Sequence, residues 1–128
     1  MSNIVISGAN RGIGLALARL YHHRGDDVIA VCRQSSGELD ALGVRVEPGI
    51  DVTDRESLAD LARRLSDVDI DVLINNAGVM RPTSLDDIED QLDAFRLQFE
   101  VNSLAPLRVT RALLDRLGEG SRVAIITS

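Results

Sequence analysis

The sequence predicts an α/β fold in which helices cover both faces of a parallel sheet. Short runs rich in β-branched residues alternate with stretches whose apolar residues recur at helical spacing. Each apolar run is followed by glycines or polar residues, as expected where parallel strands end at one edge of a sheet. The length of 128 residues, with 45% apolar and 27% charged residues, suits one globular domain.

Five strands are expected from the short apolar runs, at residues 4–7, 28–32, 44–46, 72–74 and 122–127. Apolar residues at helical spacing from Ile13 to Tyr21 predict a helix after the first strand, and Gly25 ends it. A loop with at most one short helical turn is expected between the second and third strands. Thr53, with Glu56 three residues later, forms a capping box, which predicts that a helix begins there.

One long helix is predicted between the fourth and fifth strands, from Ser84 as its N-cap to the stop signals Gly118 and Gly120. Its apolar stripe consists of Ile88, Leu92, Phe95, Phe99, Pro106, Val109 and Leu113. The stripe skips one place on the expected inward face, and Asn102 stands there, where a buried amide needs hydrogen-bond partners. Because Pro106 has no N–H, the carbonyl of Asn102 is expected to lack its helical donor. Both features single out Asn102.

Charge and composition exclude several classes of function. The net charge is −6, all fourteen basic residues are arginines, and only three residues are aromatic. An acidic chain with so few stacking side chains is not expected to bind nucleic acid. Without lysine, these residues offer no Schiff-base nucleophile. No apolar run approaches the roughly 20 residues needed to cross a bilayer, so no membrane partner is expected.

Cysteine and histidine usage favours a cytoplasmic protein without a metal site. Cys32 is the only cysteine, so no internal disulfide can form, and the first residues lack the pattern of a leader peptide. His22 and His23 are adjacent on the first predicted helix, where their side chains point apart. They are expected at the surface, near the carboxyl end of that helix.

Glycine or polar residues follow every predicted strand. They are residues 7–14 after the first strand, Arg33 after the second, Asp51 and Val52 after the third, residues 75–78 after the fourth, and Ser128 after the fifth. The glycines at 8, 12 and 14 allow a tight turn and a close approach of a pyrophosphate to the N-terminus of the first helix. The strand ends therefore predict a nucleotide site.

Two of these motifs resemble those of the short-chain dehydrogenase/reductase family. That family has this glycine spacing after the first strand and an Asn-Asn-Ala-Gly motif after the fourth, here residues 75–78, and this chain differs only in having Ser7 where Thr is usual. The similarity extends over the whole chain and includes residues 51–54 between the motifs. It implies a Rossmann-type doubly wound parallel sheet with strand order 3-2-1-4-5, truncated after strand five. Residues 1–128 would then be the NAD(P)-binding, N-terminal part of a longer reductase, most similar to the small carbonyl reductases that resemble sepiapterin reductase and the bacterial C-factor.

The resemblance implies a set of cofactor contacts. They are Gly8, Asn10, Gly12, Ile13 and Gly14 for the pyrophosphate, Asp51 and Val52 for the adenine, and Asn75, Ala77 and Gly78 for the ribose and nicotinamide. Members that prefer NAD carry an acid at the end of the second strand, where this chain has Cys32 followed by Arg33. A guanidinium from Arg33 or Arg11 suits a 2′-phosphate, so NADP(H) is expected over NAD(H).

The resemblance also implies an incomplete catalytic set. Family members use an Asn on the long helix, a Ser ending the fifth strand, and a Tyr and Lys four residues apart. Asn102 and Ser128 match the first two, but Tyr21 is the only tyrosine and has Gly25 four residues later. The expectation is an NADP(H)-dependent oxidoreductase for a small carbonyl or alcohol, homo-oligomeric when complete and inactive as this chain alone. The alternative is a non-catalytic dinucleotide-binding module or fragment.

Overall fold

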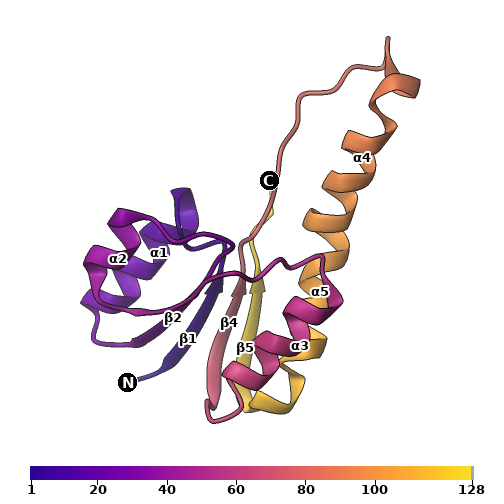
Figure 1. The fold of residues 1–128 in the computed structure, drawn as a ribbon. Coiled ribbons are helices and arrows are strands. Elements are labelled where there is room, and N and C mark those ends of the chain that lie inside the picture. The colour runs from indigo at the N-terminus through magenta and orange to yellow at the C-terminus, as the bar shows by residue number, and fades with distance from the viewer. Residues whose placement is uncertain (128) are drawn as a thin grey trace.

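The computed structural model describes residues 1–127 and contains a five-stranded parallel sheet (Figure 1). Its strands are β1 (Asn3–Ser7), β2 (Asp27–Val31), β3 (Arg45–Glu47), β4 (Ile70–Asn75) and β5 (Leu117–Ile125). Their order is β3-β2-β1-β4-β5, and every neighbouring pair is parallel. The predicted fold class and strand order are therefore confirmed.

Helices cover both faces of this sheet. They are α1 (Gly12–His23), α2 (Gly37–Leu42), α3 (Arg55–Arg64), α4 (Leu92–Phe99) and α5 (Ala105–Ala112), with 3₁₀ turns η1 (Ile88–Gln91) and η3 (Leu114–Arg116) and a π-helical turn η2 (Glu100–Leu104). Helices α1 and α2 pack on one face, and α3 and α5 pack on the other. None of the helices within residues 1–127 combines the length and hydropathy needed to cross a bilayer.

Alternation along the strands builds two apolar layers. In β1, Val5 belongs to the layer under α3 and α5, whereas Ile4 and Ile6 belong to the layer under α1 and α2. Successive side chains of a strand point to opposite faces, so a strand covered on both sides is apolar throughout. Both layers hold the central strands in place and bring their carboxyl ends to one edge.

The capping box predicts Thr53 as the N-cap of α3, and this is wrong by one residue. Asp54 is the N-cap of α3, and its Oδ2 accepts a hydrogen bond from the N–H of Ser57 at 2.9 Å. Thr53 instead donates its hydroxyl hydrogen to Asp51 at 2.7 Å. The reason is local competition: a nearby carboxylate is the stronger acceptor, so the hydroxyl stays in the loop after β3.

The predicted helical stretch between β4 and β5 is present, from Ile88 to Arg116, but its start, its regularity and its stop signals differ from the prediction. Helical structure begins at Ile88 rather than Ser84, the π-helical turn η2 interrupts it, and Gly118 and Gly120 lie within β5 instead of ending a helix. Neither η1 nor α4 contains a buried residue. Figure 1 shows why: α4 projects beyond the sheet, so its apolar stripe has no strands beneath it.

Candidate nucleotide-binding groove

A groove of about 630 Å³ runs along the carboxyl ends of the strands. Its lining includes Gly8, Asn10, Arg11, Gly12, Ile13, Arg33, Asp51, Val52, Ala77 and Gly78 from the predicted cofactor set. It also includes Val31, Cys32, Gln34, Ile50, Asn76, Val79, Arg81 and Val101. A second hollow of about 450 Å³ lies at the opposite ends of the strands and contains none of the predicted site residues. Thus the structure brings together ten of the twelve residues predicted for the cofactor.

The three glycines of the first loop serve different purposes. Gly8 has φ +64°, and a Cβ there would come within 2.8 Å of the Ala77 Cα. Gly12 has φ +56°, and a Cβ there would meet no atom within 4 Å. Glycine is favoured at this position only because of its left-handed backbone conformation. A Cβ on Gly14 would collide with the carbonyl oxygen of Gly8 and approach Asn76 Nδ2 to 2.5 Å. Gly14 does not line the groove; its role in the structure is to let α1 pack closely against the loop.

Hydrogen bonds tie the glycine loop to the segment after β4. The Ser7 hydroxyl oxygen accepts from the N–H groups of Asn76 and Ala77, both at 3.0 Å. In return, Asn76 Nδ2 donates to the carbonyl of Gly8 at 3.1 Å. The hydroxyl of Ser7 thus makes both contacts without the methyl group of a threonine. The motifs contain Ser7 and Asn76 but do not by themselves predict this contact. The signal for it is that two polar residues stand at the ends of adjacent parallel strands.

Asn75 does not reach the groove with its side chain. It is 3% exposed, and its Nδ2 donates to the Thr110 hydroxyl oxygen at 3.2 Å. Thr110 in turn donates to the carbonyl of Pro106 at 2.7 Å. Since strand side chains alternate, Asn75 faces α5 while the next residues turn toward the groove. The structure therefore gives Asn75 a role in joining β4 to α5.

Two arginines face the groove at the end of β2 and the start of α1. Within residues 1–127, neither Arg11 nor Arg33 has a carboxylate within ion-pair distance. Cys32, beside Arg33, is buried, and burial, with a smaller contribution from Asp40, raises the pKa of its thiol. Cys32 therefore adds no negative charge beside the guanidinium of Arg33.

Asp51 is held ionised beside the groove. Its Oδ1 accepts from the Thr53 hydroxyl at 2.7 Å and from the Thr53 N–H at 2.9 Å. These two bonds, and more weakly the charges of Arg33 and Arg108, lower the pKa of the Asp51 carboxyl. Arg108 Nη1 also donates to the Thr53 carbonyl at 2.8 Å and to Glu100 Oε1 at 3.0 Å. The loop after β3 is thereby attached to α5 and η2.

Asn102 is exposed rather than on the inward face, so the prediction of a buried amide is wrong. The reason is η2, in which the N–H of Ala105 donates to the carbonyl of Glu100, five residues earlier, and shifts the helical register. The amide still has partners: Oδ1 accepts from the Val79 N–H and Nδ2 donates to the Val79 carbonyl, each at 2.8 Å. Ser128, the other predicted catalytic residue, lies outside the described residues.

Comparisons with known proteins agree with this geometry. Residues 2–128 match the short chain dehydrogenase family. The chain is 42% identical to 1-hydroxy-2-glutathionyl-2-methyl-3-butene dehydrogenase of Rhodococcus sp. (strain AD45), over 100% of this chain and 57% of that protein. A carbonyl reductase from Pseudomonas aeruginosa PAO1, solved in complex with NADP, is 36% identical with a TM-score of 0.88, over 100% of this chain and 61% of that one. An NADP-bound structure from Burkholderia multivorans, named a putative short-chain dehydrogenase/reductase, is 31% identical with a TM-score of 0.89. The match covers 99% of this chain and 58% of that one.

Proposed function

Because the chain belongs to the short-chain dehydrogenase family, we propose that it forms the NADP(H) site of an oxidoreductase acting on a small carbonyl or alcohol. Family membership supports the reaction class, and the lining of the groove supports the cofactor. The chain spans 57% of its Rhodococcus relative, so activity belongs to the whole protein. There, the Tyr and Lys that the family uses would complete the site with Asn102 and Ser128.

Arg11 and Arg33 are the residues that favour NADP(H) over NAD(H). Arg11 and Arg33 line the groove, no carboxylate in residues 1–127 pairs with either, and Cys32 stands where an acid would bind a ribose 2′-hydroxyl. A guanidinium binds a phosphate through charge-assisted, often bidentate hydrogen bonds. Two solved neighbours contain NADP, which agrees with this assignment.

The N-terminus of α1 supplies the pyrophosphate site. Arg11 at the N-cap makes no side-chain hydrogen bond to the first turn, and no other side chain among residues 1–127 caps it. The N–H groups of that turn are free to donate to phosphate oxygens, and the helix dipole favours negative charge there. The lack of a Cβ at Gly8 and Gly14 lets the loop pack closely against Ala77 and Asn76 beside this helix end. When bound, the nicotinamide supplies or accepts the hydride.

Titration of the chain with NADPH and NADH, followed by nucleotide fluorescence, tests the cofactor assignment. We expect NADPH to bind at least about tenfold more tightly, since hydrogen bonds to charged groups contribute about 1.5–3 kcal/mol. Arg33→Ala should weaken NADPH binding by about tenfold or more and leave NADH binding unchanged. Arg19→Ala, an exposed residue of α1 away from the groove, is the matched control. Equal binding of the two nucleotides by the wild-type chain would refute the NADP(H) assignment.

An activity assay separates the oxidoreductase from the alternative, a non-catalytic binding module. We expect carbonyl reduction with NADPH from the whole protein and none from the 128-residue chain. Loss of a general acid lowers the reaction rate by about a hundred- to ten-thousandfold. Turnover by the chain alone that Ser128→Ala abolishes would contradict this. Homo-oligomer formation and a cytoplasmic location remain predictions for the whole protein.

A further inference from the structure

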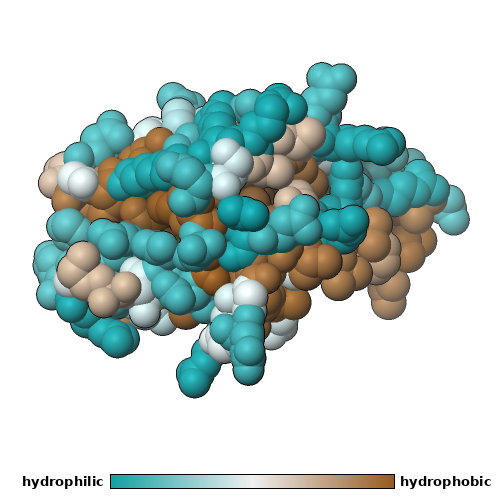
Figure 2. Space-filling model, turned by 90° about the horizontal axis from the view of Figure 1, so that it is seen from below, coloured by the Kyte–Doolittle hydropathy of each residue, from teal (hydrophilic) through white to brown (hydrophobic). Residues whose placement is uncertain are grey.

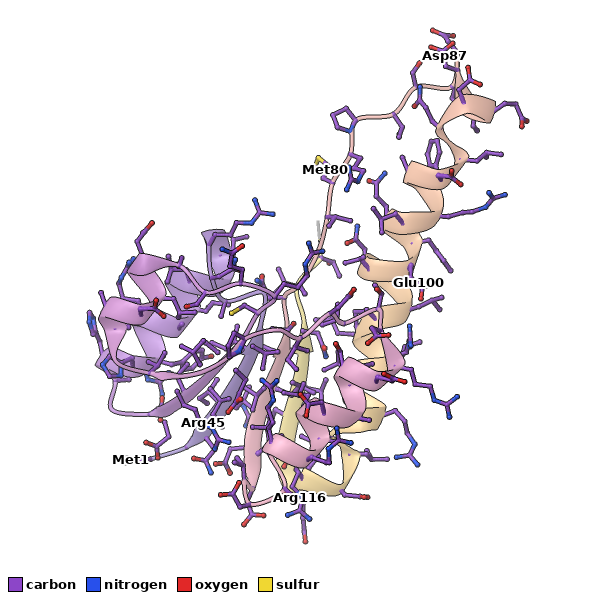
Figure 3. The ribbon with its side chains drawn as sticks, viewed as in Figure 1. Met1, Arg45, Met80, Asp87, Glu100 and Arg116 are labelled. Carbon is purple, nitrogen blue, oxygen red and sulfur yellow. The ribbon has the colours of Figure 1, made fainter. Side chains whose placement is uncertain are left out.

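The segment after β4 runs beside α4 without strand partners in residues 1–127 (Figure 3). Three amide side chains of the helical region reach its backbone instead. Gln98 Oε1 accepts from the Arg81 N–H at 3.3 Å, and Gln98 Nε2 donates to the Arg81 carbonyl at 3.2 Å. Asn102 makes the same pair of bonds with Val79, and Gln91 Oε1 accepts from the Ser84 N–H at 2.8 Å. Side chains from a helix thus replace a neighbouring strand.

The spacing of these contacts follows from backbone geometry. Gln98 and Asn102 are four residues apart, which along a helix is about 6 Å. Val79 and Arg81 are two residues apart, which along an extended chain is about 6.6 Å. In extended backbone the N–H and C=O of one residue point to the same side and the next residue turns the other way. The N–H and C=O groups of Val79 and Arg81 can therefore both face the helix, while those of Met80 between them face away.

We propose that Gln98 is a positioning residue for the cofactor groove: with Asn102 it forms an amide clamp that holds the backbone of Val79 and Arg81 as one wall. Val79 and Arg81 both line the groove, as does Gly78 before them. A Cβ on Gly78 would come within 3.2 Å of Asn102 Oδ1, so glycine lets the wall approach the clamp. This inference rests on the proposed function, because the wall matters only if the groove binds a dinucleotide.

Little else holds this wall. Helix α4 has no buried residue, so apolar packing against residues 79–84 is weaker than in the core of the sheet. The bonds of the clamp join backbone groups that would otherwise hydrogen-bond to water, so each of them adds only modestly to stability. Loss of the two Gln98 bonds should therefore let the wall move while the sheet keeps its fold.

Hydrogen exchange of backbone amides and NADP⁺ titration, both on the 128-residue chain, test the clamp. Gln98→Met removes both bonds to Arg81, and with them the bond from Nε2 to the Ala94 carbonyl within the helix, at similar side-chain size. We expect faster exchange at Arg81, unchanged exchange at Val79, and about three- to tenfold weaker NADP⁺ binding. Gln98→Glu keeps an acceptor for the Arg81 N–H, so exchange at Arg81 should return toward the wild-type rate. Arg96→Met, an exposed residue of α4 with its ion pair directed to Asp93, is the matched control.

Each outcome decides one part of the inference. Unchanged exchange at Arg81 in Gln98→Met would overturn the clamp itself. Faster exchange with unchanged NADP⁺ affinity would overturn its positioning role. If the wild-type chain bound no NADP⁺, the proposed function would fail, whereas exchange at Arg81 would still report on the clamp. Faster exchange together with weaker binding, rescued in part by Gln98→Glu, supports the whole inference.

Discussion

The sheet body and the projecting arm, residues 79–104, are held by different forces. In the body, Leu61, Leu73 and Leu113 are at most 1% exposed. In the arm, Phe95 and Phe99 are 36% and 60% exposed. Hydrogen bonds from the Gln98 side-chain amide join the helix to the extended segment beside it. Figure 2, seen from below, shows apolar side chains exposed among hydrophilic ones on this face of the molecule. One helical apolar pattern therefore has two outcomes, depending on whether strands lie beneath it.

Paired truncations give the largest expected contrast between the two regions. Leu73→Ala, at a position with 0% exposure, should lower the free energy of unfolding by about 2–5 kcal/mol through lost burial and a cavity. Phe99→Ala, on the arm, should change it by less than about 0.5 kcal/mol, as at ordinary surface positions. Urea unfolding followed by circular dichroism measures both. A loss for Phe99→Ala as large as for Leu73→Ala would show that the arm is packed as the body is.

A methyl group at Gly14 tests the close packing at the junction of the sheet and the groove. Gly14→Ala places a Cβ against the Gly8 carbonyl oxygen and within 2.5 Å of Asn76 Nδ2, so it should destabilise the chain by about 1–3 kcal/mol. NADPH binding should weaken with it. Gly37→Ala, in α2 with nothing within 4 Å of its Cβ, is the control and should leave stability equal or slightly higher. Equal effects of the two substitutions would contradict the packing argument.

The smallest expected effect concerns the acid behaviour of Asp51. Hydrogen bonds from Thr53 lower the pKa of its carboxyl in the folded chain, so the stability it contributes is complete above the unfolded pKa of about 3.9 and is lost as the pH falls through the folded pKa. Asp51→Asn should therefore flatten the pH dependence of unfolding below about pH 4. Asp93→Asn, on the arm with its side chain fully exposed, is the control. Identical acid unfolding curves for wild type and Asp51→Asn would refute this role.

The sequence predicts the strands of the body well and the ends of its helices less well. Runs such as Ile4 to Ser7 predict buried strands because a strand covered on both faces has to be apolar throughout. The helix start at Ser84 is wrong because the Ser84 hydroxyl accepts from the Asp86 N–H in a local turn, and helical structure begins only at Ile88. The cap at Thr53 was wrong because Asp51 competes for its hydroxyl, a contact that depends on how the loop folds.

The sequence alone determined the alternating strands and helices, the three glycines of the first loop and the arginines that face the groove, because local periodicity and residue chemistry carry that information. Only the tertiary structure decided that Asn75 turns toward α5, that Asn102 is exposed, and that Gln98 pairs with the backbone of Arg81. Those contacts depend on the register shift at η2 and on where the sheet ends beneath α4. Both depend on how distant segments meet in space, which spacing along the chain does not encode.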